Sequence, residues 1–295
     1  MSLGLSATRL ITADGDSTPT TVLRLSPTTT GWKFDYIDLP VSDRMKTLLL
    51  LGGMTPDVTV LYYNSINRIV RAHYGGSNAA SLYLYSANIG AMLQHAVAGD
   101  WPAFARVYTE PIAALTARDG PAARVDGVVV CAILAHKVSR ELTEALAPSG
   151  VPLLHIADFL AAHVKARYPR VKRLGLLGPK ITMLGAEDPD FFVGRLQSAE
   201  NGFAVIVPET EQDMNDVNRG MMEEVVKGAA AVTDATRAMF VRQAKELVER
   251  GAQVVVLGST DLGFVLRQED IGGNIPLIEP ASVHAEEVAK WACEE

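Results

Sequence analysis

Cysteine is scarce in this chain: Cys131 and Cys293 are the two cysteines among 295 residues. Cys131 lies inside an apolar run, and Cys293 lies near the end of the sequence, where we expect an exposed tail. Two such residues do not provide the disulfide framework on which small secreted domains depend. We therefore expect a reducing compartment and a cytoplasmic protein.

Basic charge and long apolar runs are also lacking. The chain has 27 Lys and Arg residues against 34 Asp and Glu residues, which gives a net charge of -7. Nucleic-acid phosphates are bound by clustered Lys and Arg, and no basic stripe is visible, so no nucleic-acid partner is expected. No apolar run approaches the roughly 20 residues that span a bilayer, so no membrane partner is expected either.

The chain does contain a repeat of short apolar runs that end in small residues. The paired segments are residues 48–53 and 174–178, residues 126–132 and 253–259, and residues 151–154 and 275–278. Apolar strands that alternate with helices favour parallel sheets covered on both faces. We predict an α/β fold of two pseudo-symmetric lobes, each a parallel sheet with helices on both faces, and a ligand cleft between them.

Three segments are predicted along the chain. Residues 45–165 form the first α/β lobe, and residues 166–295 form the second, whose C-terminal helix could return to the first lobe. Residues 1–44 are an N-terminal extension of unknown role. Alternation over residues 21–25 and 32–37 predicts a hairpin or an added edge strand there.

A glycine turn follows the first predicted strand, where ligands gather in parallel sheets. Residues 52–56 lead into a helix whose first N–H groups suit a carboxylate or a phosphate. Taken alone, the same residues are better explained by a tight turn without a ligand. The spacing fits neither G-x-G-x-x-G nor the phosphate loop, so it does not support nucleotide binding.

This turn is the first of several motifs along the chain. They are residues 50–56 (LLGGMTP), 135–138 (AHKV), 151–156 (VPLLHI), 175–178 (GLLG), 257–261 (LGSTD), 275–278 (IPLI) and 283–286 (VHAE). Together they resemble the aspartate/glutamate racemase family from residue 45 to about residue 292.

The resemblance implies an amino-acid racemase that needs no cofactor, neither PLP nor a metal, and that forms a homodimer. Its substrate would be a small carboxylate or an amino acid. One cysteine from each lobe would face the substrate α-carbon, one removing the proton and the other returning one. Thiols suit this role because their pKa, ordinarily ~8.5, can be lowered towards neutrality.

The first cysteine position of the family is Ala132 when the chain is aligned on the Ala-His pair at 135–136. Alanine has no proton to exchange. Ile133 and Leu134 replace polar family residues, so this side of the expected cleft becomes apolar. Cys131 is the alternative thiol. Its side chain should point opposite to that of Ala132, into sheet–helix packing, unless the register shifts at the strand end.

The second cysteine position of the family is Ser259 when the chain is aligned on Gly258 and Thr260. Serine is a weak base unless a neighbouring group activates it. Asp261, which replaces a family glutamate, could orient or activate this hydroxyl.

Several further residues are candidates for ligand binding. They are Gly53, Met54, Thr55, Thr59, Ile133, Leu134, Lys227, Thr260 and His136. Lys227 matches a lysine that, by the resemblance, holds a substrate carboxylate in aspartate-specific members, but the helix dipole explains it equally well. His136 either lines the pocket or is a structural histidine.

Two functional hypotheses follow. In the first, the chain is a racemase-like isomerase or lyase that acts on a small carboxylate through Ser259 or Cys131. In the second, it is a noncatalytic protein that binds a small carboxylate or serves in regulation on the same fold. Classical two-thiol racemisation is not expected in either case.

Overall fold

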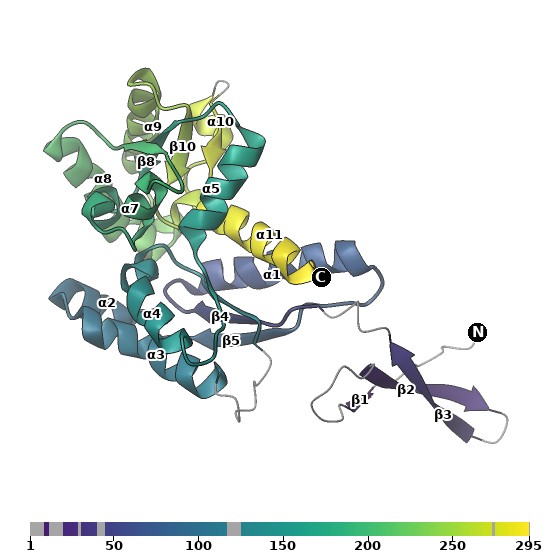
Figure 1. The fold of residues 1–295 in the computed structure, drawn as a ribbon. Coiled ribbons are helices and arrows are strands. Elements are labelled where there is room, and N and C mark those ends of the chain that lie inside the picture. The colour runs from purple at the N-terminus through teal and green to yellow at the C-terminus, as the bar shows by residue number, and fades with distance from the viewer. Residues whose placement is uncertain are drawn as a thin grey trace. The chain divides into compact units, whose positions relative to one another are not determined.

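The computed structural model describes residues 9–11, 20–28, 31–39, 45–116, 125–272 and 275–294 (Figure 1). The strands before residue 45 form one unit, and residues 46–293 form another. In the first unit, β1 (Arg9–Ile11), β2 (Thr20–Thr28) and β3 (Gly31–Leu39) make an antiparallel sheet in that order. The pairing of β2 with β3 confirms the predicted hairpin.

The described strands of residues 46–293 form two parallel sheets of four. The order in the first is β5-β4-β6-β7, and the order in the second is β11-β10-β8-β9. Their bounds are β4 Leu48–Gly52, β5 Leu82–Ser86, β6 Gly127–Val130, β7 Leu153–Leu154, β8 Arg173–Leu177, β9 Ala204–Ile206, β10 Val254–Leu257 and β11 Leu277–Ile278. The predicted α/β fold with two lobes is confirmed.

Helices connect the strands and cover the sheets. In the first half they are α1 Pro56–Tyr74, α2 Ile89–Ala98, α3 Trp101–Thr116, the 3-10 helix η2 Leu134–Val138, α4 Ser139–Leu146 and α5 Ile156–Arg167. In the second half they are α6 Lys180–Met183, η3 Gly185–Glu187, α7 Phe192–Gln197, α8 Glu211–Glu223, η4 Val225–Lys227, η5 Ala229–Ala231, α9 Asp234–Glu249, η6 Leu262–Phe264, α10 Gln268–Ile271 and α11 Pro280–Cys293.

Each lobe has its own apolar core, because its central strands are buried on both faces. All residues of β4, β6 and β10 are buried, as continuous apolar strands in a covered parallel sheet should be. Side chains of α5 on the first-lobe side of the predicted boundary at 165/166 pack in the core of the second lobe. That boundary stays a prediction.

The last helix, α11, returns to the first lobe and lies beside α1 (Figure 1). His284 ties α11 to the first lobe. Its Nε2 donates to the Leu154 carbonyl of β7 at 2.9 Å, and its Nδ1 accepts from the Tyr62 hydroxyl of α1 at 2.9 Å. Cys293, at the end of α11, is buried, so the expected exposed tail is wrong. The reason is that the last turn packs on the first lobe, where the Lys46 N–H donates to the Ala292 carbonyl.

A second set of contacts joins the lobes around residues 188–190. Lys137 forms an ion pair with Asp188 at 2.6 Å. The Asp190 carbonyl accepts hydrogen bonds from the Ser139 hydroxyl and from Nε2 of His155. These contacts hold the loop after β6 against the second lobe and so fix the two sets of strand ends relative to each other.

Candidate functional site

A cavity of about 230 Å³ lies where the carboxyl ends of the two sheets face each other. Met54 follows β4, Ala132 follows β6, Pro179 follows β8, and Gly258 and Ser259 follow β10. Both lobes therefore contribute to one cavity at the place where parallel sheets hold ligands.

Seven of the residues predicted for the site line this cavity. They are Met54, Thr55, Ala132, Ile133, Leu134, Ser259 and Thr260. Five others are not among the lining residues: Gly53, Thr59, Cys131, His136 and Lys227. The structure thus brings Ala132 and Ser259, from different lobes, into one cavity.

Gly53 and Thr59 shape the turn between β4 and α1. Gly53 has a φ of +96°, and a Cβ there would lie 2.1 Å from the carbonyl oxygen of Ala87, so glycine is required. The Thr59 hydroxyl accepts from the Gly53 N–H at 3.1 Å and donates to the Thr55 carbonyl at 3.2 Å. These two residues therefore set the position of Thr55, which does line the cavity.

His136 holds the loop that carries Ala132. Its Nε2 accepts from the Ile156 N–H at 3.3 Å, so its Nδ1 carries the proton and donates to the Ala132 carbonyl at 2.8 Å. Burial lowers the pKa of His136 to about 4, which keeps the ring neutral at pH 7. A buried neutral ring with both nitrogens bonded positions Ala132 and does not exchange protons with a ligand.

His155 lies beside His136, with the ring centroids 4.3 Å apart. Its Nδ1 accepts from the Ala157 N–H at 3.1 Å, and its Nε2 donates to a backbone carbonyl of the second lobe. Burial lowers the pKa of His155 and that of His284. His136, which holds the loop that carries Ala132, thus packs beside two further buried, neutral histidines.

Ser259 is the lining residue at which the sequence predicts acid–base chemistry, and its hydroxyl faces a carboxylate. Ser259 Oγ donates to Oδ2 of Asp261 at 3.4 Å, and it accepts from the Asp261 N–H at 3.3 Å. Burial raises the pKa of Asp261, while hydrogen bonds with Thr55 and Ser259 lower it in part. The Thr55–Asp261 bond joins the two lobes at the cavity. A carboxylate 3.4 Å away is a weak activator of a serine hydroxyl.

Cys131 is buried and does not line the cavity, as the alternation along the strand predicts. Burial raises the pKa of its thiol. A thiol with a raised pKa stays protonated near neutral pH, so it cannot act there as a base or as a nucleophile.

Cys131 is accordingly expected to resist iodoacetamide in the folded protein. The thiolate is the reacting species, so alkylation at pH 7.5 should be about tenfold or more slower than in guanidinium chloride. Mass spectrometry of the peptide that contains Cys131 measures both rates. Rapid alkylation of the native protein, blocked by a bound carboxylic acid, would instead place this thiol in the cavity.

Lys227 lies in η4, where it is exposed, next to Val226, which does line the cavity. Its N–H donates to the Glu224 carbonyl, as in a helix end. Among the residues that the structure describes, no group of three or more His, Cys, Asp or Glu side chains could hold a metal ion. Within the same residues, no helix is long and apolar enough to cross a membrane.

Sequence reasoning missed the apolar helix residues that complete the cavity. They are Ile89, Leu93, Ala96 and Val97 from α2, Ile181 from α6, Met221 and Met222 from α8, and Val226 from η4. On α2 these residues lie at i, i+4, i+7 and i+8, a spacing that is typical of a helix face packed on a core. The apolar face of this helix is visible in the sequence, but the same pattern is expected of a helix that packs on a core.

Comparisons with known proteins agree with this geometry. A sequence model of the Asp/Glu/hydantoin racemase family matches residues 51–288. A candidate Asp/Glu racemase from Yersinia pestis is 32% identical, with a TM-score of 0.72 over 84% of this chain and 99% of that one. An aspartate racemase homologue from Pyrococcus horikoshii OT3 is 25% identical, with a TM-score of 0.65 over 85% and 100%.

A more distant structure shares the fold alone. It is the glutamate racemase of Francisella tularensis in complex with D-glutamate, 9% identical, with a TM-score of 0.51 over 84% of this chain and 81% of that one. The family match spans most of the chain, and the Yersinia protein aligns over nearly its full length. The chain therefore belongs to the Asp/Glu/hydantoin racemase family.

Proposed function

We propose that this protein binds a small carboxylic acid or amino acid in the cavity between its lobes and does not racemise it by the two-thiol route. The observation that carries the proposal is that Ala132 and Ser259 line one cavity from opposite lobes. By the family resemblance, these are the two cysteine positions. Racemisation needs an acid or base on both faces of the α-carbon, and Ala132 supplies neither.

The cavity retains groups that suit a carboxylate. Thr55 is the N-cap of the 19-residue helix α1 and lines the cavity, so the positive end of this helix lies at the cavity wall, beside the Asp261 carboxylate that Thr55 contacts. The Ser259 and Thr260 residues of the second lobe line the same space. The glutamate racemase of Francisella tularensis binds D-glutamate on the same fold, which supports an amino acid or a related acid here.

Calorimetric titration with a panel of amino acids and short carboxylic acids tests the binding site. Ser259→Phe fills the cavity and should weaken any acid that binds the wild type by about tenfold or more. Ser77→Phe adds the same ring at an exposed position that does not line the cavity, and it should leave the affinity unchanged. Equal affinities for the wild type and Ser259→Phe would place the ligand elsewhere.

A second candidate function is proton transfer at one face, as in an isomerase or a lyase. The contact between Ser259 and Asp261 favours it, because it places a hydroxyl–carboxylate pair at the second cysteine position. Exchange of a ligand α-hydrogen for deuterium with retained configuration, lost in Ser259→Ala, would support this function. Binding without exchange would support the noncatalytic one.

A further inference from the structure

We infer that the ligand is a carboxylic acid with one bulky apolar substituent, aromatic or branched aliphatic, and not a dicarboxylic acid. This inference rests on the proposed function and specifies the chemical class of its ligand. The observations that carry it are the side chains that line the cavity, the exposure of its rim and its size.

The lining of the cavity is of two kinds. The strand ends supply polar groups, such as Thr55 and Ser259, which can hold a carboxylate. The helices supply mostly apolar side chains, such as Leu93 and Val97 of α2 and Met222 of α8. Thr182 of α6 and Asn218 of α8 are the uncharged polar residues among them. A ligand that satisfies both kinds has one polar head and one apolar tail.

A second carboxylate would have no cationic partner in this cavity. None of the described residues that line it is Lys, Arg or His. Lys180 lies between two lining residues, but its Nζ pairs with Glu211 at 3.0 Å and donates to Asn215 at 2.9 Å. Asp261 adds a carboxylate of its own to the lining. The N-terminus of α1 can accept one carboxylate, whereas a second carboxylate would be buried without a partner, so the cavity disfavours a ligand with two carboxylates.

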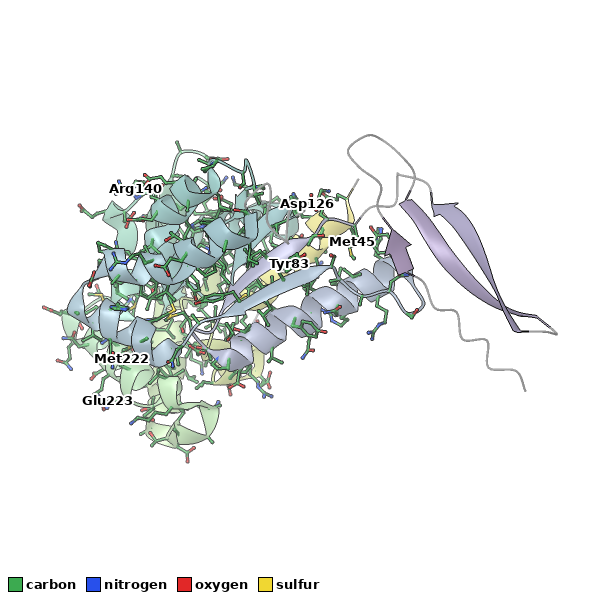
Figure 2. All side chains as sticks on the ribbon, turned by 90° about the horizontal axis from the view of Figure 1, so that it is seen from below. Met45, Tyr83, Asp126, Arg140, Met222 and Glu223 are labelled. Atoms are coloured by element: carbon green, nitrogen blue, oxygen red, sulfur yellow. The ribbon has the colours of Figure 1, made fainter. Side chains whose placement is uncertain are left out.

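The rim of the cavity exposes apolar side chains to solvent. Val97 is 81% exposed, Met222 is 43% exposed and Val226 is 38% exposed, and all three line the cavity. Met222 lies at the surface of the second lobe, at the end of α8 (Figure 2). Apolar surface gathered around a cavity is typical of a binding groove, because an apolar ligand removes it from water.

The size of the cavity fits such a substituent. An engineered apolar cavity of about 150 Å³ binds benzene. The cavity between the lobes measures about 230 Å³, so it can accept a ring and a carboxylate together.

Titrating the full chain with two matched pairs of acids tests the inference. Phenylacetate and succinate form one pair, and phenylalanine and aspartate form the other; each pair keeps the head group and changes the tail. The aromatic member should bind about tenfold or more tightly than its acidic counterpart. Tighter binding of succinate and aspartate would overturn the inference alone, whereas no binding by any of the four acids would overturn the proposed function as well.

A charge variant shows whether the preference arises at the rim. Met222→Lys adds a cation to the cavity, and it should reduce the preference for phenylacetate over succinate by about tenfold. Val60→Lys places the same charge on α1 at an exposed valine that does not line the cavity, and it should leave the preference unchanged. If both variants leave the preference unchanged, the apolar rim does not select the ligand.

Discussion

Replacing both Ala132 and Ser259 with cysteine is expected to raise the rate at which the protein exchanges the α-hydrogen of a bound amino acid. Both residues line one cavity, and each belongs to a different lobe, so two thiols would face the ligand from two sides. Positioned acid–base groups contribute about 100-fold or more to proton transfer. The double variant should therefore exchange the α-hydrogen of phenylalanine about 100-fold faster than the wild type, as followed by NMR in deuterium oxide.

The single variants separate this effect from a change in cavity shape. Ala132→Cys and Ser259→Cys each leave one wall without a thiol, so neither should interconvert the enantiomers. Ala132→Ser is the matched control for the double variant, because it places hydroxyls of similar size on both walls without a thiol. A double-cysteine variant that binds phenylalanine but exchanges no faster than this control would show that the walls do not flank the α-carbon.

Acid is expected to destabilise the fold through the buried histidines. The pKa of His136 is about 4 in the folded protein and about 6.5 in an unfolded chain, so the unfolded state binds more protons between these values. The stabilisation that neutral His136 contributes is therefore present above pH 6.5 and is lost as the pH falls towards 4. For His136 alone, the free energy of unfolding should fall by about 3 kcal/mol between pH 7 and pH 4.

Other groups titrate over the same range, so the prediction rests on a difference between variants. Burial lowers the pKa of His155 and of His284 and acts in the same direction, whereas Asp261 and Glu279, with raised pKa values, act in the opposite one. Comparing each variant with the wild type removes these shared contributions.

His136→Gln should lower the free energy of unfolding at pH 7. Between pH 7 and pH 4, however, this free energy should fall by less in the variant than in the wild type, as measured by urea unfolding. His73→Gln, at an exposed position on α1, should keep the slope of the wild type. Equal losses in the wild type and in His136→Gln would show that His136 is not held neutral by the fold.

The strand ends can be located from the sequence, because a buried apolar run that breaks into small residues has few alternative structures. Ala132 and Ser259 follow such runs, and both line the cavity. The alternation along a strand also placed Cys131 away from it. These local signals depend on residues that are neighbours in the chain.

Features that depend on distant contacts were harder to predict. Val97 lies on an apolar helix face, and whether that face packs on a core or borders a cavity is decided by α8, more than 100 residues later. His136 could have lined the pocket, but its ring is held by Ile156 and by the Ala132 carbonyl. Cys293 is buried because α11 returns to the first lobe, which no local pattern reveals.

The central proposal is that the cavity holds no acid–base group at Ala132, so that one face of a ligand α-carbon has no proton donor or acceptor. Incubating the wild type with each enantiomer of phenylalanine and of aspartate in deuterium oxide, followed by chiral chromatography, tests it most directly. The account predicts that every enantiomer remains pure. Conversion of either enantiomer into the other, abolished by Ser259→Ala, would contradict it.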